Sequence, residues 1–210
     1  MTKGEPIMIL KRPGVNTQQT MIDKASVKEV IEFERFCRDN ALWEEMEKCY
    51  AKESHVMISW FQGTGAEFVA ASRKMKGRAP HKIYNTEIWL NGDKAIAIML
   101  VTIQYRVVIN GCPVELMSDA KLVFRVQKMD DLWMIQSMEG IYEKDALVPV
   151  YPNGNLTISR DELSKFRDPY ACLSYVLTME GYKVDSALPG IDQPEQVEKL
   201  YHEVNEWLIK

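Results

Sequence analysis

The sequence predicts an α+β fold in which helices come first and a curved antiparallel sheet follows. Two capping boxes, Ser26–Glu29 and Thr64–Glu67, open helices in the first part of the chain, because a hydroxyl and a carboxylate three residues apart satisfy N–H groups of a first turn. From His81 onward the apolar period changes to two, which is typical of strands. Asn-Gly, the strongest short hairpin signal, occurs at Asn91 and Asn110. Successive hairpins build antiparallel sheets, and helices followed by strands indicate an α+β domain.

The helical part is expected to begin after an irregular arm, residues 1–20, which contains two glycines and two prolines. The first helix should start near Ser26 and end at Asp39-Asn40, because both of these residues favour local side-chain bonds to the backbone. A second helix should follow over 42–50, where apolar residues recur at helical spacing.

A short strand over 55–61 and a turn over 62–65 are expected before the third helix, which should run from Thr64 to about Met75. The four strands that follow are predicted at 81–90, 94–109, 114–128 and 132–143. Pro149 and Pro152 mark the end of this unit, so residues 21–150 should form one domain. Residues 151–210 are expected to be a helical extension, either a lid or an arm exchanged between subunits.

The composition excludes several classes of protein. With 26 basic and 30 acidic residues the net charge is −4, so no basic excess is available for nucleic acid. No stretch approaches the roughly 18 apolar residues that cross a membrane, and the N-terminus does not resemble a signal peptide. The four cysteines lack metal-ligand spacing and are expected to be free thiols in a reducing cytoplasm. Gly63-Thr64-Gly65 is too short for a dinucleotide-phosphate loop, so no cofactor is expected. Because the cysteines lack metal-ligand spacing, no bound metal is expected either.

Three histidines are the candidates for acid/base chemistry. His55 and His202 lie among charged residues and are expected on the surface. His81 follows a proline at the start of a strand, from which its ring can reach the concave side of the sheet. Asp39 lies between two predicted helices, where a helix-capping role is the ordinary interpretation. Neither His81 nor Asp39 identifies a site alone.

Three segments of the chain, taken together, resemble SnoaL-like proteins of the nuclear-transport-factor-2-like superfamily. In FCRDNALWEEMEKCYAKE an aspartate, Asp39, stands four residues before Trp43. In HKIYNTEIWLNGDKAIA a histidine, His81, precedes a strand and a Gly-Asp hairpin. In DDLWMIQSMEGIYEKD a tryptophan precedes Ile135 by two residues in the last strand. The resemblance covers about residues 22–146 and is closest to bacterial bile acid 7-dehydratases, with scytalone dehydratase and polyketide cyclases more distant.

The resemblance implies a strongly curved sheet wrapped over three helices, a cystatin-like cone with a deep cavity. It also implies that Asp39 and His81 form an acid/base dyad. The chain departs from the dehydratase pattern where a tyrosine is replaced by Glu34 and an arginine by Gly140. A family carboxylate on the preceding strand would match Gln104 or Ile103, neither of which is acidic.

The sequence and the resemblance together predict a cofactor-independent lyase of dehydratase type, or an isomerase, for a hydrophobic cyclic molecule that is steroid-like or aromatic. The alternative is a non-catalytic module that binds a ligand or partner in the same cavity. The residues expected to contact the substrate are Trp60, Tyr84, Gln104, Tyr105 and Met138. Tyr84 can share the face of His81 only if a bulge intervenes, since successive side chains of a strand alternate. A homo-oligomer, dimer or trimer, is expected from the resemblance.

Overall fold

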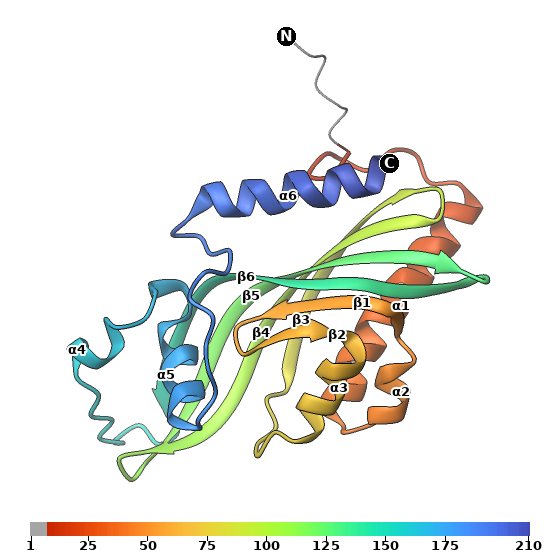
Figure 1. Ribbon diagram of the computed structural model, residues 1–210. Helices are drawn as coiled ribbons and strands as arrows, with labels where there is room; N and C mark the ends of the chain where they lie inside the picture. Colours follow the sequence, from red (N-terminus) through yellow and green to blue (C-terminus); the bar gives the residue numbers. More distant parts are fainter. Residues whose placement is uncertain (1–7) are drawn as a thin grey trace.

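The computed structural model describes residues 8–210 and confirms the α+β architecture (Figure 1). Its helical half contains α1 (Gln18–Asp39), α2 (Trp43–Glu47) and α3 (Gly65–Arg73), with the short hairpin of β1 (Tyr50–Ile58) and β2 (Phe61–Thr64) between α2 and α3. The four long strands are β3 (His81–Asn91), β4 (Lys94–Ile109), β5 (Cys112–Met129) and β6 (Leu132–Pro149). Within the described residues the sheet order is β2-β1-β6-β5-β4-β3.

The predicted hairpins connect β3 to β4, β4 to β5 and β5 to β6. The β4–β5 loop is Asn110-Gly111, whose φ values of 50° and 77° are the left-handed pair that a two-residue Asn-Gly hairpin requires. In the β3–β4 hairpin Asn91 pairs with Lys94, so the loop is Gly92-Asp93, and Gly92 has a φ of 59°. The pairing between β4 and β5 runs without interruption from Lys94↔Gln127 to Ile109↔Cys112. Among the described strands, β1 and β6 are the one parallel pair, because α3 carries the chain from the β1–β2 hairpin to β3 at the opposite edge of the sheet.

Several element boundaries in the N-terminal half differ from the prediction. The second helix, expected over 42–50, ends at Glu47, and β1 begins at Tyr50, five residues before the expected strand. α1 begins at Gln18, eight residues before the expected start near Ser26, because Thr17 and Thr20 form a capping box there. Ser26 lies inside the helix. The first hairpin turns at Ser59-Trp60, so the segment predicted as a turn is instead β2. Thr64 does cap α3, accepting a hydrogen bond from the backbone N–H of Glu67 at 3.3 Å.

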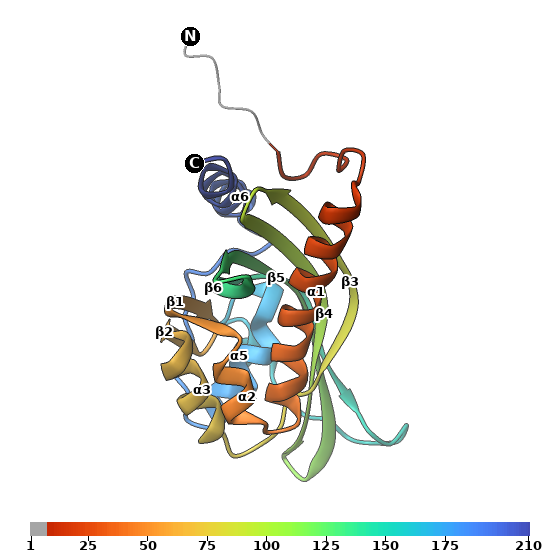
Figure 2. The same cartoon turned by 90° about the vertical axis from the view of Figure 1, so that its right-hand side faces the viewer.

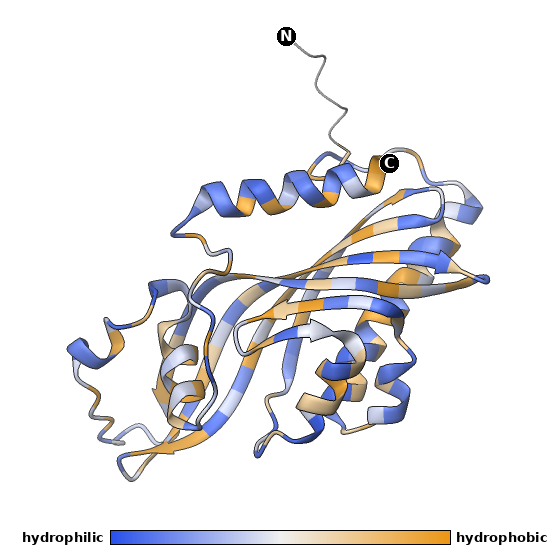
Figure 3. Ribbon diagram, in the orientation of Figure 1, coloured by the Kyte–Doolittle hydropathy of each residue, from blue (hydrophilic) through white to orange (hydrophobic). Residues whose placement is uncertain are grey.

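Helices cover both faces of the curved sheet (Figure 2). The concave face packs against α1, α3 and α5 (Ala171–Met179), and the main core fills this side with residues such as Val27, Phe68, Phe124 and Val176. The convex face is covered in part by α6 (Pro194–Ile209), whose Leu200, Val204 and Leu208 pack in a separate cluster with Ile96, Ile98, Val123 and Ile141. Figure 3 shows apolar residues recurring along α6 between hydrophilic ones, as a one-sided contact requires.

The C-terminal extension is joined to the sheet by specific bonds. After α4 (Arg160–Leu163) and a short 3₁₀ turn (Asp168–Tyr170), the carboxylate of Asp145 on β6 accepts the backbone N–H of Leu173 in α5 at 2.7 Å. Further along, backbone bonds of Tyr142 with Pro189 and Ile191, both 3.0 Å, add a bridge beside β6. Among residues 8–210, no helix is long and apolar enough to cross a membrane.

Candidate active site

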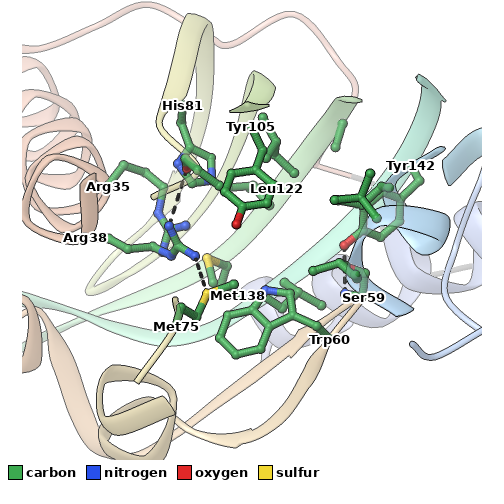
Figure 4. Close-up of a pocket in the computed structure, with 17 residues that line it drawn as sticks. Arg35, Arg38, Ser59, Trp60, Met75, His81, Tyr105, Leu122, Met138 and Tyr142 are labelled. Carbon is green, nitrogen blue, oxygen red and sulfur yellow. Dashed lines mark hydrogen bonds between the residues drawn. The ribbon is translucent and has the colours of Figure 1, made fainter. Parts of the chain in front are cut away.

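A pocket lies between the concave face of the sheet, α1, the loop before β3, and α5 (Figure 4). The cavity volume is about 50 Å³. Because roughly 10–15 Å³ by this measure accommodates one water, the pocket suits a compact molecule. Its lining residues are Arg35, Arg38, Ile58, Ser59, Trp60, Met75, Ala79, His81, Ile103, Tyr105, Ala120, Leu122, Met138, Tyr142, Leu173, Val176 and Leu177.

Asp39 and His81, expected to form a dyad, are hydrogen-bonded at the edge of this pocket. Asp39 is the last residue of α1, which ends because Asn40 bonds the carbonyl of Phe36 with its side chain at 2.8 Å and Ala41 adopts a φ of 59°. His81 is the first residue of β3. One oxygen of Asp39 accepts the backbone N–H of His81 at 2.7 Å, and the other lies 2.9 Å from ring nitrogen Nδ1. A single carboxylate therefore positions both the strand and the ring.

The surroundings keep the His81 ring neutral. Burial, together with the positive charges of Arg35 and Arg38, lowers its pKa to about 4, although the bond to Asp39 opposes the shift. Burial would raise the pKa of Asp39, but its bonds to His81 outweigh burial and the pKa lies below the usual value. Because an ionised carboxylate only accepts, Nδ1 carries the proton and Nε2 keeps its lone pair. The pair thus has the tautomer of a general base.

Two arginines of α1 lie on the same side of the pocket as His81 (Figure 4). Arg35 is fully buried and makes a two-pronged ion pair with Glu34, which also accepts the hydroxyl of Tyr50 at 2.9 Å. Arg38 is only loosely held: its closest partners are the carbonyl of Ala79 at 3.4 Å and the sulfur of Met75 at 3.3 Å. The glutamate that replaces the family tyrosine is therefore the counter-ion of Arg35.

Three of the five predicted substrate contacts line the pocket: Trp60, Tyr105 and Met138. Tyr84 does not, although β3 has an irregularity between Ile83 and Thr86; the residue is 67% exposed and its hydroxyl bonds Thr102 on the outer face. Gln104 also lies outside the lining, because alternation along β4 turns its neighbours Ile103 and Tyr105 inward instead.

Sequence reasoning missed Arg38, Ser59, Tyr142 and the α5 residues of the pocket wall. The sequence could have identified Arg38 by its spacing. It lies eleven residues after Val27, on the apolar face of α1, and a charged residue on a buried face indicates a function or a partner. No spacing pattern could have identified Ser59, because it contacts a residue distant in sequence. Its backbone N–H donates to the hydroxyl of Tyr142, 83 residues away, at 2.8 Å.

The remaining histidines and the cysteines lie away from this chemistry. His55 is exposed, as is His202, which pairs with Glu206 at 3.1 Å across one helical turn. All four cysteines are free, and three of them are buried. Within the part of the chain that the structure describes, no cluster of His, Cys, Asp and Glu could hold a metal ion.

Comparison with known sequences finds relatives over nearly the whole chain. An uncharacterized protein of Emericella nidulans is 28% identical over 90% of this chain and 87% of its own. Pea pathogenicity protein 2 of Fusarium vanettenii is 25% identical over 89% of this chain and 86% of its own. No protein-family model matches the chain. The names of these two fungal relatives do not state a reaction.

Solved structures share the fold. A scytalone dehydratase-like protein of Novosphingobium aromaticivorans superposes with a TM-score of 0.51 at 14% identity, covering 69% of this chain and 99% of that one. A type 2 hexachlorocyclohexane dehydrochlorinase, LinA, gives a TM-score of 0.53 at 12% identity, covering 65% and 95%. The protein thus has the curved-sheet fold that the resemblance to nuclear-transport-factor-2-like proteins implied. The comparisons give no support to the narrower resemblance to bile acid 7-dehydratases.

Proposed function

We propose that this protein is a cofactor-independent lyase, in which His81 removes a proton from carbon and a leaving group departs from the neighbouring carbon. The observation that carries the proposal is the Asp39–His81 hydrogen bond, 2.9 Å long, at the edge of a mostly apolar pocket. A neutral imidazole whose tautomer is fixed by a carboxylate is the arrangement that general-base catalysis requires.

The reaction balances without a cofactor. Nε2 of His81 takes the proton, the electron pair of the C–H bond becomes the new C=C bond, and the leaving group departs with its own pair. Asp39 then stabilises the imidazolium, which can return the proton to a departing hydroxide so that water leaves. The apolar walls exclude bulk water and strengthen the pairing of Asp39 with His81.

Two structural neighbours support an elimination. One is named for loss of water and another for loss of hydrogen chloride, and both reactions remove a proton and a leaving group from adjacent carbons. Of the two predicted substrate classes, steroid-like and aromatic, the cavity volume of about 50 Å³ favours a compact aromatic molecule with a single ring. Trp60 and Tyr105 supply aromatic walls for such a ring.

Elimination can be tested with compact cyclic alcohols and halides, following the new double bond by ultraviolet absorbance and carbon-bound hydrogen exchange in D₂O by NMR. We expect His81→Gln to abolish both signals and Asp39→Asn to slow turnover on the order of 10³-fold or more. His55→Gln, at an exposed histidine, is the matched control and should leave the rate unchanged.

The orienting role of Asp39 is wrong if Asp39→Asn keeps more than about a tenth of the wild-type rate. Ligand binding in the pocket without exchange or elimination for any compound would favour the alternative, a non-catalytic binding module. Thermal unfolding of each variant should accompany the assay, since a large loss of stability in His81→Gln would assign His81 a structural role.

A further inference from the structure

Arg38 has a buried hydrogen-bonding edge, Nε and Nη2, whose one partner among the described residues is the sulfur of Met75. Its side chain is 7% exposed and lines the pocket. Among the described residues, its Nε has no hydrogen-bond partner. Nη2 meets only the thioether of Met75 at 3.3 Å, and Nη1 reaches the carbonyl of Ala79 at 3.4 Å. A thioether is a weak acceptor, so the Nε–Nη2 edge is a strong donor pair left almost unused.

Two other arginines of this chain show what that edge is suited to bind. Arg35 clamps the carboxylate of Glu34 with Nε and Nη2 together. Arg167 does the same to Asp192, with distances of 3.0 Å from Nε and 2.6 Å from Nη2. Such two-pronged pairing matches the spacing of the two oxygens of a carboxylate. Of these three arginines, Arg38 alone has no carboxylate on its Nε–Nη2 edge within the described residues.

The two acidic side chains near Arg38, Glu34 and Asp39, are already hydrogen-bonded to other residues. Glu34 is bound by Arg35 and Tyr50. Asp39 uses both oxygens on His81, and its nearer oxygen is 3.9 Å from Nη1 of Arg38. The charge of Arg38 is therefore poorly neutralised; burial and then the repulsion of Arg35 lower its pKa to about 10. Buried charges of this kind are costly unless they are paired.

We propose that Arg38 binds the carboxylate of a compact, otherwise apolar ligand, and that this anion displaces the sulfur of Met75. Met75 lies in the loop between α3 and β3, and its unbranched side chain has three rotatable bonds with which to move aside. The rest of the ligand would lie against the apolar side of the pocket, formed by residues such as Leu122, Met138 and Val176.

This inference deepens the proposed function, because it names the substrate as a carboxylic acid. It rests on the proposed function only in that both use the same pocket. Asp39 links the two parts, lying 2.9 Å from the ring of His81 and 3.9 Å from Arg38. An acid held by Arg38 would thus present a nearby carbon to His81. Fixing the anion in this way supplies the orientation on which proton abstraction depends.

Binding of benzoate, phenylacetate and cyclohexanecarboxylate, each against its neutral amide, tests the inference by calorimetry, with a change in tryptophan fluorescence as a second signal, since Trp60 lines the pocket. We expect at least one acid to bind at least tenfold more tightly than its amide. Arg38→Met, which replaces the arginine with an apolar side chain of similar length, should remove that preference, and Arg38→Lys should keep part of it. Arg106→Gln, at an exposed arginine paired with Glu115, is the control and should bind like the wild type.

The inference fails if no acid is preferred over its amide, or if Arg38→Met, shown to be folded by circular dichroism, keeps the preference. His81→Gln separates this test from that of the proposed function, because the variant should still bind the acid although it cannot abstract a proton. Acid binding without elimination would support Arg38 and contradict the lyase. Elimination from neutral substrates alone would support the lyase and contradict Arg38.

Discussion

His81 is a histidine whose neutral form is favoured by its surroundings, and this has consequences for activity. Burial and the two arginines lower its pKa to about 4. Since the base must be neutral, we expect the acid limb of kcat/KM to fall near pH 4 rather than near the ordinary value of 6.5. A pH profile of elimination in overlapping buffers checks this. A midpoint at 6 or above would contradict the inferred environment of the ring.

The same shift makes stability depend on pH in a defined direction. The folded pKa of about 4 lies below the unfolded value of 6.5, so the unfolded chain binds more protons between these limits. Stability should be fully present above pH 6.5 and fall by at most about 3 kcal/mol as pH decreases to 4. His81→Gln should lack this component. Urea unfolding at several pH values compares the two proteins, and parallel curves would refute the assignment.

Glu34 is predicted to be indispensable for stability because of its ion pair with buried Arg35. Glu34→Gln leaves that guanidinium buried and under-neutralised, which should lower the free energy of unfolding by about 3–5 kcal/mol. Glu45→Gln is the control: its bond to Lys48 is exposed, and its loss should leave the free energy of unfolding almost unchanged. Urea denaturation measures both changes, and equal effects would contradict the burial argument.

Among the elements, α5 matters for the pocket although it belongs to the C-terminal extension. It contributes Leu173, Val176 and Leu177 to the wall, and Glu180 just beyond it accepts the hydroxyl of Tyr105 at 2.6 Å. Of the two roles predicted for the extension, this contact within one chain favours a cover over the pocket. The extension therefore completes the cavity that the strands and α1 leave open.

The attachment of α5 can be tested at Asp145, which accepts the N–H of Leu173 at the start of the helix. Asp145→Ala should cost about 1 kcal/mol, the usual effect of losing a helix-capping side chain, and should speed proteolysis after residue 150. Glu143→Ala, which removes a partly exposed pair with Lys121, should leave the cleavage rate unchanged. Identical cleavage of Asp145→Ala and wild type would show that α5 is held by packing alone.

In the molecule as a whole, one sheet separates two apolar clusters that stabilise different parts of the fold. The concave core surrounds the pocket, and the convex cluster fixes α6. Leu200→Ala in α6 should therefore lower the free energy of unfolding by about 2–5 kcal/mol while ligand affinity stays unchanged. The exposed Lys199→Ala is its control. A loss of affinity in folded Leu200→Ala would show that the two faces are coupled.

Self-association remains a prediction from the resemblance. α6 occupies part of the convex face, so any pairing through that face would use the remaining surface. Light scattering should give a multiple of the 24.2 kDa chain mass, and a concentration-independent mass of 24.2 kDa would refute the oligomer.

The amino-acid sequence alone determined the long strands, their hairpins and the end of α1. Asn-Gly turns, the alternation of apolar residues and Asp39-Asn40 act within a few residues, so local chemistry suffices to recognise them. Boundaries failed where two local signals competed, as at Thr17 and Ser26, because both positions carry a helix-capping hydroxyl. The pairing of Asp39 with His81 came from the resemblance, since 42 residues separate them.

Only the tertiary structure decided what surrounds that pair. It turned Tyr84 outward and Tyr105 inward, placed α5 over the cavity, and left Arg38 facing it without a carboxylate. These outcomes depend on strand register, on the docking of an extension and on which buried charges find partners. Such contacts join residues distant along the chain, and no local pattern encodes which of them will meet.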